Sequence, residues 1–340
     1  MAPQISVILP AYNAEQTLEK AVQSVLRQSF RSLEVIVVND GSTDGTAALA
    51  ESLANRDARV HVLHGPNAGI SAARNRGLHA AAGTYVTFCD DDDVWLPGAL
   101  AALYSEARTH GADLVRGDYR LMRQTRNGTY AALPHSAGAR CVLEHTGRQY
   151  AAMLQNSGPQ FVWNALYRRA ALQGLRFEET CRFGLEDFIF NAEVYARIAR
   201  AIYLPQQVYC HYEGFGSTSV CSDPLALKNR IDAVPRWMQA ESRAAARWCD
   251  AAALPGLWEQ RCAQAITFLM HQLHNGQADP GMRRYAWHVL HKALGQAPYH
   301  VGSVLRHSST IGPKQTAALL LYRFRMPQVY ELLPHKEDQL

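Results

Sequence analysis

Several features that define common classes of protein are missing from this chain of 340 residues. The seven cysteines are scattered and include no C-x-x-C pair, which argues against a disulfide framework and against a zinc site. No apolar run approaches the roughly 18 residues that a membrane-spanning helix needs. No G-x-G-x-x-G follows the first expected strand, and no G-x-x-x-x-G-K-[ST] occurs. These absences argue against a dinucleotide oxidoreductase and a P-loop protein.

The overall composition is that of an ordinary globular protein. Hydrophobic residues make up 48% of the chain and charged residues 19%, and the length suffices for one large domain and a smaller one. No signal peptide is visible, because residues 1–4 lead directly into a strand-like run, and the scattered cysteines suit a reducing compartment. We therefore expect a cytoplasmic protein. The modest net charge of +4, with no basic run interleaved with aromatics, predicts no nucleic-acid partner.

The first 120 residues alternate between strand and helix signals. Strand-like apolar runs occupy residues 5–9, 35–38, 60–63 and 85–89, and helical spacing marks the segments 18–26, 44–53 and 70–82. We expect Pro10 to end the first strand. The alternation predicts an α/β fold, with a mostly parallel sheet and helices on both faces. Strand signals stop near residue 220, so we expect an α/β domain over residues 1–220 and a smaller helical region over residues 221–340.

The expected strands all end in polar residues. Ligands of open α/β sheets bind beyond the carboxyl ends of the strands. In this chain those ends carry four polar segments: Pro10–Asn13, Asn39–Ser42, His64–Asn67 and Asp90–Asp93. Four such segments meeting at one edge predict a ligand site there.

The run of four aspartates, Asp90–Asp93, is the most unusual of these segments. Like charges packed this closely repel each other, so a bound cation or full solvation has to compensate for the repulsion. Carboxylates at the end of a buried strand suit a hard cation, Mg²⁺ or Mn²⁺, that also holds a substrate diphosphate. The alternatives are a solvated acidic turn and an incidental Ca²⁺ site. The cluster therefore indicates an enzyme that handles a nucleoside diphosphate.

Five segments, in this order, resemble the motifs of one enzyme family: residues 6–13, 37–44, 67–75, 90–95 and Gly184–Asp187. Together they resemble the family 2 glycosyltransferases with the GT-A fold, and the resemblance covers roughly residues 4–220. Enzymes of that family move a sugar from a nucleoside diphosphate to an acceptor hydroxyl with inversion. The resemblance implies the same Rossmann-like, mostly parallel sheet and the same type of reaction for this chain.

The resemblance implies a site for a divalent cation, Mn²⁺ or Mg²⁺, in the aspartate cluster. It gives Asp92 as the direct metal ligand, with Asp90 as the other acidic residue of a D-x-D motif. Asp91 then lies beside the nucleotide and contacts its ribose. The alignment can slip by one position within four identical residues, and the family's usual small residue at position 91 is an aspartate here.

The resemblance also implies a nucleotide-binding surface, with a UDP-sugar as the favoured donor. Asp40 would accept the pyrimidine N–H, Tyr12 would line the base with Pro10 and Ala11, and Arg74 would reach the nucleotide. Each role has a plainer alternative. Asp40 could form an Asx turn, Tyr12 could be packed, and Arg74 could be a surface residue.

Glu186 and Asp187 are expected to open a helix, because apolar residues follow them with mostly helical spacing. Acidic residues are favoured in the first turn of a helix by its dipole, which is the plain interpretation. The resemblance implies more. Asp187 would be the general base that takes the proton of the acceptor hydroxyl, and Glu186 would position Asp187 or the acceptor.

Three further residues are weaker candidates for the acceptor side. Trp163 and Asn164 resemble a family segment near the acceptor, although a tryptophan in an apolar strand usually belongs to the core. The segment Tyr209–Glu213 resembles a family loop that carries an arginine where this chain has Glu213. This departure leaves a contact with the diphosphate open. His211 is the candidate substitute, and a simple polar role is its alternative.

The resulting hypothesis is an inverting, metal-dependent glycosyltransferase that acts on a cell-surface glycan or glycolipid precursor. The acceptor class follows from the resemblance alone. One alternative is a sugar-nucleotide nucleotidyltransferase, but Pro10–Asn13 is not the Gly- and Arg-rich phosphate loop that it would need. Another is a catalytically inactive subunit that binds a nucleotide sugar, and the presence of Asp92 and Asp187 argues against it.

The C-terminal part of the chain is basic, with thirteen Lys and Arg against six Asp and Glu in residues 222–327. Between residues 314 and 333, apolar side chains recur at helical spacing beside basic ones: Leu319, Tyr322, Met326, Val329, Tyr330 and Leu333, with Lys314, Arg323 and Arg325. Two interpretations stay open. The segment is a helix packed on the protein, or it lies on the inner face of an anionic membrane near a lipid-linked acceptor.

Overall fold

The computed structural model describes residues 2–125, 127–134, 141–143, 161–181, 184–214, 223–248, 254–275, 278–294, 301–306, 316–317 and 319–320. The elements, in chain order, are β1 (Ile5–Ala11), α1 (Leu18–Leu26), β2 (Leu33–Asp40), α2 (Thr46–Arg56), β3 (Val60–Gly65), α3 (Ile70–Ala80), β4 (Tyr85–Phe88), β5 (Val94–Trp95), α4 (Ala99–His110), β6 (Leu114–Gln124), β7 (Tyr130–Ala132), β8 (Cys141–Leu143), β9 (Ala165–Arg168), a 3₁₀ turn (Arg169–Leu172), α6 (Glu186–Tyr195), β10 (Ala201–Glu213), α7 (Pro224–Trp248), α8 (Leu254–Asn275), α9 (Pro280–Leu294) and α10 (Val301–Arg306).

The described strands form one mixed sheet in the order β3-β2-β1-β4-β9-β6-β10-β5, with β7 beside β6 and β8 beside β10. The parallel arrangement predicted for the first four strands is confirmed. Beyond them, β9 enters antiparallel between β4 and β6. Its first residue, Ala165, accepts a hydrogen bond from Thr87 near the carboxyl end of β4, so β9 starts beside the end of β4 and runs back along it. No helical crossover is needed to reach such a strand.

The first strand is longer than expected, because β1 continues through Pro10 to Ala11. The carbonyl of Ile8 accepts the amide of Cys89, so the backbone of Ile8 faces β4. Pro10 lies two residues further and faces the same side, beyond the point where β4 has ended. The N–H that Pro10 lacks would have no partner strand on that side, so no hydrogen bond of the sheet is lost. Pro10 remains paired with Val38 of β2 on its other side.

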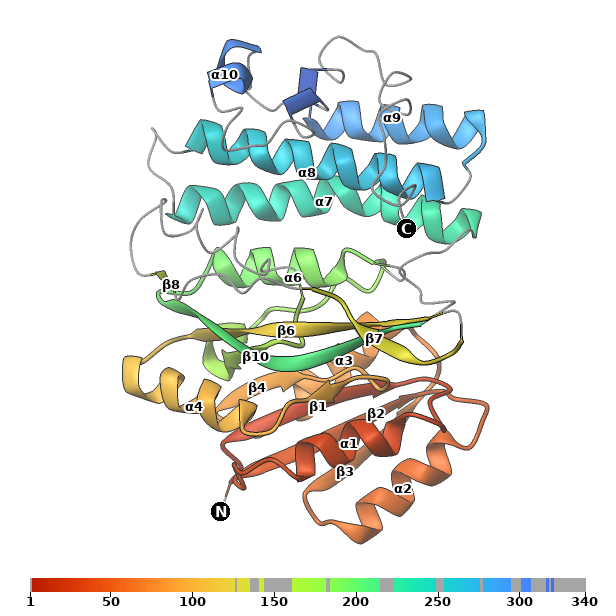
Figure 1. Cartoon of the computed structure of the whole chain (residues 1–340), viewed down its shortest axis with the longest axis vertical. Coiled ribbons are helices and arrows are strands. Elements are labelled where there is room, and N and C mark those ends of the chain that lie inside the picture. Colours follow the sequence, from red (N-terminus) through yellow and green to blue (C-terminus); the bar gives the residue numbers. More distant parts are fainter. Residues whose placement is uncertain are drawn as a thin grey trace.

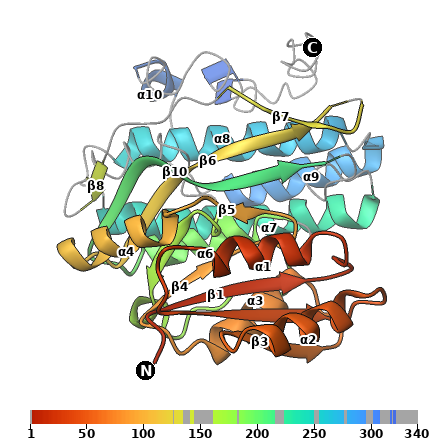
Figure 2. The ribbon, with the colours of Figure 1, turned by 60° about the horizontal axis from the view of Figure 1, so that its bottom comes forward.

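Helices pack on both faces of this sheet, and the C-terminal helices form a further layer beyond α6 (Figures 1 and 2). The helices α1, α2 and α4 pack on one face of the sheet, and α3 and α6 pack on the other. The helix α6 is covered on both sides. Its Phe190 and Val194 point toward the sheet, whereas Leu185, Ile189 and Ala192 pack with α7, α8 and α9. The helix that begins with the predicted base is thus held between the sheet and the C-terminal helices.

The C-terminal helices α7, α8 and α9 run side by side beyond α6 (Figure 1). Among the described residues, no helix is both long and apolar enough to cross a lipid bilayer. Leu319 is buried against these helices, as expected for a packed segment. The other apolar residues singled out between 322 and 333, and Lys314, Arg323 and Arg325, lie outside the described residues. The domain boundary near residue 220 stays a prediction.

Candidate active site

The polar ends of β1, β2 and β4 meet at the carboxyl edge of the sheet, as predicted. Ala11 pairs with Asn39 across β1 and β2. The amide of Tyr12, just after β1, donates to Asp91 Oδ2 at 3.0 Å. Two segments that lie far apart in the sequence therefore share one edge, where strand order places β1 between β2 and β4.

Within the aspartate cluster, Asp93 is hydrogen-bonded to the rest of the fold through both of its carboxylate oxygens. It is fully buried. His211 Nδ1 donates to its Oδ2 at 2.8 Å, and the amide of Tyr212 donates to its Oδ1 at 2.8 Å. Because both oxygens are engaged, Asp93 ties β10 to the acidic loop, and its carboxylate is the least available of the four to a cation.

Asp91 and Asp92 carry charge that is poorly compensated. Burial, followed by the charges of Asp90 and Asp93, raises the pKa of Asp91 to about 7, and the Tyr12 amide only partly opposes this. Desolvation, followed by repulsion from the three other aspartates, raises the pKa of Asp92 to about 8. A cation placed among these groups would reverse both shifts, because it favours the charged form of a carboxylate.

The residues present fit a divalent cation whose coordination is completed by oxygens of water or of a bound phosphate. Asp92 is exposed and has no hydrogen-bond partner in the part of the chain that the structure describes, and Asp90 and Asp91 each have one engaged oxygen. Among the same residues, no group of three or more Asp, Glu, His or Cys side chains converges into a complete metal cage. Mg²⁺ sites commonly use one or two carboxylates, with water and phosphate oxygens as the remaining ligands.

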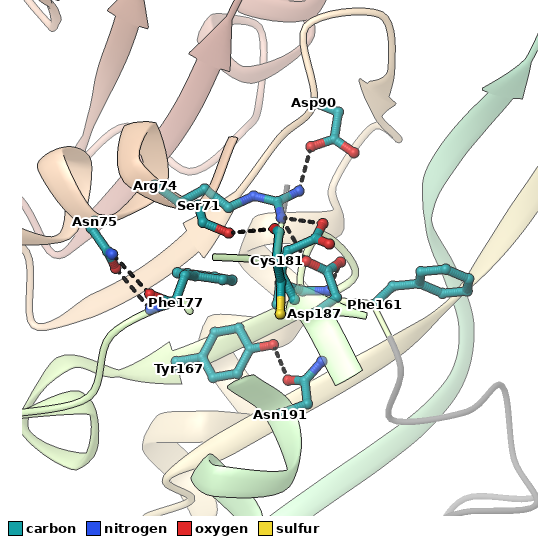
Figure 3. Close-up of polar contacts among 12 residues, drawn as sticks. Ser71, Arg74, Asn75, Asp90, Phe161, Tyr167, Phe177, Cys181, Asp187 and Asn191 are labelled. Carbon is teal, nitrogen blue, oxygen red and sulfur yellow. Dashed lines mark hydrogen bonds and ion pairs between the residues drawn. The ribbon is translucent and has the colours of Figure 1, made fainter. Parts of the chain in front are cut away.

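Arg74 of α3 joins the acidic cluster to the Glu186–Asp187 pair (Figure 3). Its Nη2 donates to Asp90 Oδ1 at 3.0 Å, and its Nη1 donates to Asp187 Oδ1 at 2.6 Å and to Glu186 Oε1 at 3.2 Å. Burial disfavours its charge, but Asp187, Asp90 and Glu186 raise the pKa of Arg74 above its ordinary value. Arg74 is buried, so the surface position considered for it is wrong. Its role toward a nucleotide stays a prediction.

Asp187 lies in the first turn of α6, as predicted. Its second oxygen accepts the amide of Val162 at 3.2 Å. Burial raises the pKa of Asp187 to about 7, with Arg74 opposing the shift and Glu186 and Asp90 adding to it. A general base is most effective when its pKa lies near the working pH, so a carboxyl pKa raised toward neutrality suits that predicted role. Gly184 and Leu185 precede the helix with φ of 116° and 68°. The left-handed conformation of Leu185 is uncommon for a non-glycine residue and makes this turn a strained one.

Asp40 anchors the loop before α3. Its carboxylate accepts the amides of Ala68 at 3.1 Å and Gly69 at 2.7 Å, and it pairs with Arg76. The Ala68 amide also lies 3.2 Å from Oδ2, so each oxygen of Asp40 already has two donors, which fills the roughly four positions of a carboxylate. Tyr12 is 48% exposed, so it is not packed in the core. Pro10 and Ala11 are buried in β1. The nucleotide contacts implied for these residues stay predictions.

The acceptor-side candidates differ in their surroundings. Trp163 is 2% exposed and stacks on Tyr209, with ring centroids 4.6 Å apart. Asn164 is fully buried, donates to the Gly117 carbonyl at 2.8 Å and accepts from Arg116. Both side chains belong to the core, which is the plain interpretation and argues against direct contact with an acceptor.

His211 is partly exposed, and its acidic neighbours favour its protonated form. Burial would lower its pKa, but the bond to Asp93 and the charges of Asp93, Asp90 and Asp92 raise it to about 9. Glu213, which stands where the family loop carries arginine, pairs with Arg123 of β6 at 2.8 Å. A cationic side chain is therefore present beside this position, although it comes from another strand.

One buried network was missed by the sequence analysis. Arg116 of β6 is fully buried and donates to the carbonyl of Phe161 and to the side chains of Asn164 and Asn191. Asn191 also accepts from Tyr167 at 2.7 Å. The available signal was an arginine directly after the apolar pair Leu114–Val115, since a charge at the buried start of a strand requires internal partners.

Comparison with known proteins defines the class. The sequence model described as "Glycosyl transferase family 2" matches residues 6–176, half of the chain. The chain therefore belongs to glycosyl transferase family 2. It is 36% identical over 220 residues to the uncharacterized glycosyltransferase EpsJ of Bacillus subtilis, covering 63% of this chain and 62% of EpsJ. It is also 41% identical over 107 residues to the GalNAc(5)-diNAcBac-PP-undecaprenol beta-1,3-glucosyltransferase of Campylobacter jejuni, covering 31% of this chain and 35% of that protein.

A solved structure shows the fold over nearly the whole chain. Residues 1–349 of S. aureus TarS, crystallised with UDP, match with a TM-score of 0.72 and 20% identity, covering 96% of this chain and 89% of TarS 1–349. The predicted GT-A fold is confirmed by this similarity. The chain spans 62% of the length of EpsJ and about a third of the Campylobacter protein.

Proposed function

We propose that this protein is an inverting, divalent-metal-dependent glycosyltransferase that moves a sugar from a nucleoside diphosphate to an acceptor hydroxyl. One observation carries the proposal. Arg74 holds Asp90 of the acidic cluster and Asp187 of α6 on one guanidinium, so donor-side charge and a base-type carboxylate meet at the same edge of the sheet. Membership of glycosyl transferase family 2 supports the type of reaction.

The reaction that fits this arrangement is a single displacement at the anomeric carbon. Asp187 takes the proton of the acceptor hydroxyl while the oxygen of that hydroxyl forms the new bond to the anomeric carbon. The bond from the carbon to the diphosphate oxygen breaks, and the nucleoside diphosphate leaves with the bonding electrons. Attack from the face opposite the leaving group inverts the configuration. Glu186, one residue before Asp187, shares Arg74 with it and helps to position it.

Asp92 and Asp90 are the proposed ligands of a divalent cation, Mn²⁺ or Mg²⁺. When bound, such an ion neutralises the charge that develops on the diphosphate leaving group. The raised pKa values of Asp91 and Asp92 support this assignment, because they report desolvation and repulsion between carboxylates, both of which a bound cation would offset. Asp91 stays close to the nucleotide in this arrangement, since it already binds the loop after β1.

A UDP-sugar is the proposed donor. The similar TarS structure was solved with UDP and also with UDP-GlcNAc. In this chain, the exposed Tyr12 stands near Asp91 at the same edge, and a pyrimidine N–H would bind Asp40 by replacing one of its present donors, such as Arg76. Pro10 and Ala11 shape the backbone beneath Tyr12. His211 is the proposed cation for the diphosphate.

A cell-surface glycan or a lipid-linked precursor is the proposed acceptor. The name of the Campylobacter relative describes an undecaprenol-linked acceptor. Such a substrate would bring the protein to the inner face of the cell membrane from the cytoplasm. The basic C-terminal region, with thirteen Lys and Arg against six Asp and Glu, suits an anionic surface.

The test is a panel of nucleotide sugars, scored by thermal stabilisation and by donor turnover, with Mn²⁺ and with EDTA. A true donor raises the melting temperature by mass action and is turned over only with the metal. Release of pyrophosphate from a nucleoside triphosphate would point to a nucleotidyltransferase instead. Stabilisation without any turnover would point to an inactive binding subunit. Full activity in EDTA would remove the metal from the proposal.

A further inference from the structure

Arg74 occupies an environment unlike that of a ligand-binding arginine. It is 1% exposed, and its guanidinium lies 5.4 Å from the ring centre of Phe177. Three carboxylates, those of Asp90, Glu186 and Asp187, already accept from its two terminal nitrogens. Turning this group toward a diphosphate would leave Asp187 buried without its cation, which is an unfavourable state.

The turn of α3 that carries Arg74 is itself fixed to the segment leading into α6 (Figure 3). Asn75 and the backbone of Phe177 exchange two hydrogen bonds, at 2.8 and 3.0 Å. Ser71 Oγ donates to the carbonyl of Cys181 at 3.3 Å. One helical turn therefore holds the approach to α6 through its backbone and the first turn of α6 through Arg74.

The guanidinium also sets a geometric relation between two distant segments. It is a rigid planar fork, so the directions of its N–H groups are fixed relative to each other. One branch holds Asp187, at the start of α6, and the other holds Asp90, after β4. The opposite side of Asp187 is held by the amide of Val162, whose neighbour Phe161 is bound by the buried Arg116. Asp187 thus has little freedom to move toward or away from Asp90.

We propose that Arg74 is a positioning residue of the transfer reaction and not a nucleotide-binding one: it fixes the Asp187 carboxylate at a set distance and angle from Asp90. This inference rests on the proposed function, in which Asp187 is the base and Asp90 belongs to the donor side. It predicts that the loss of Arg74 lowers turnover through misplacement of the base, while the nucleotide still binds.

The experiment compares Arg74→Gln with the wild-type chain in two measurements. Calorimetry with UDP and Mn²⁺ gives nucleotide affinity, and steady-state turnover of the donor gives kcat and KM. A misplaced base costs about 10²-fold in rate. We expect kcat to fall about 10²-fold and the Kd for UDP to change less than about threefold. A matched control is Arg168→Gln, which removes an arginine paired with Asp113 at the opposite edge of the sheet. It should lower the melting temperature and leave kcat and KM unchanged.

The contrary result is a tenfold or larger rise in Kd with turnover per bound donor unchanged, which would make Arg74 a nucleotide ligand. If Arg74→Gln does not fold, Arg74→Lys serves the same comparison. Its single ammonium keeps the charge but cannot hold two carboxylates at fixed angles, so kcat should still fall about tenfold with affinity kept. A wild-type chain that neither binds UDP nor turns over any donor contradicts the proposed function itself, whereas the contrary result above contradicts only this inference.

Discussion

At the scale of single residues, two arginines decide how the acidic side chains behave. Arg74 is shared by three carboxylates, and Arg116 binds neutral oxygens around the same helix. Because a buried charge needs partners, each arginine fixes the groups around it. The outcome is an uneven set of carboxylates. Asp93 is fully engaged, Asp92 is open to a cation, and burial raises the pKa of Asp187 to about 7.

The first residue-scale prediction concerns the base. Asp187→Asn keeps the shape of the side chain but cannot take a proton, so kcat should fall by about 10²–10⁴. Donor affinity should change little, since the proposed function places Asp187 on the acceptor side of the reaction. Steady-state kinetics and calorimetry with UDP check both quantities. Collapse of donor binding with normal turnover per bound donor would instead make Asp187 a donor ligand and turn attention to Glu186.

The second prediction concerns the metal ligand. Asp92→Ala should abolish transfer and the Mn²⁺-dependent part of nucleotide binding. The fold should persist, because Asp92 is exposed and its removal relieves repulsion from three neighbouring aspartates. Calorimetry with UDP, with and without Mn²⁺, and a melting curve check these expectations. Metal-dependent binding that survives in Asp92→Ala would shift the ligand role to Asp90 or Asp91.

The third prediction concerns pH. The pKa of Asp187 is raised to about 7, and only its ionised form can accept a proton. The ratio kcat/KM should therefore rise with pH through about 7 and then level off. The stability of the fold should depend on pH in the opposite direction. A carboxyl whose pKa is raised on folding stabilises the protein below its ordinary pKa, and that contribution is lost as the pH rises through about 7. In Asp187→Asn, both dependences on pH should be weaker. If the rise of kcat/KM with pH is unchanged in this variant, that rise belongs to another ionising group.

At the scale of elements, the sequence predicted what periodicity and motif spacing determine. The strand–helix alternation gave β1 to β4 and α1 to α3, and the acidic start of α6 was placed correctly, because these signals are local. The antiparallel insertion of β9 and the burial of Asn164 were not predictable, since both depend on partners far away in the sequence. For the same reason, the three carboxylates around Arg74 could not be read from residues 70–80.

The element-scale prediction tests how α6 is fixed. Phe190 is 1% exposed and stacks on Phe177, with centroids 4.0 Å apart. Phe190→Ala should reduce the free energy of unfolding by about 3–5 kcal/mol, the usual cost of removing a buried phenylalanine. Leu225→Ala is the matched control, because Leu225 is 61% exposed on α7 and should change stability by at most about 0.5 kcal/mol. Chemical denaturation measures both, and a cost below about 1 kcal/mol for Phe190→Ala would mean that α6 is held mainly by its polar contacts.

At the scale of the whole molecule, the C-terminal helices complete the core around α6. Leu185, Ile189 and Ala192 would face solvent without α7, α8 and α9. The helical region is therefore part of the support for the predicted base. Leu319 joins the same core, which links the segment after residue 314 to this support. The same region is basic, and the proposed function has it meet an anionic surface.

The whole-molecule prediction concerns that surface. The full chain should co-sediment with anionic vesicles at low salt and lose this binding at high salt, because salt screens the attraction. A chain that ends near residue 312 should melt at a lower temperature, since it lacks Leu319 in the core. Neutral vesicles are the control. Equal vesicle binding by both chains would show that the segment after residue 312 is not the membrane contact.

The central claim is a single displacement with Asp187 as the base, and the configuration of the product tests it most directly. With an α-linked UDP-sugar, Mn²⁺ and an acceptor, NMR of the transfer product gives the anomeric configuration of the new glycosidic bond, which does not mutarotate. A single displacement predicts a β linkage. An α-linked product would contradict the proposed mechanism.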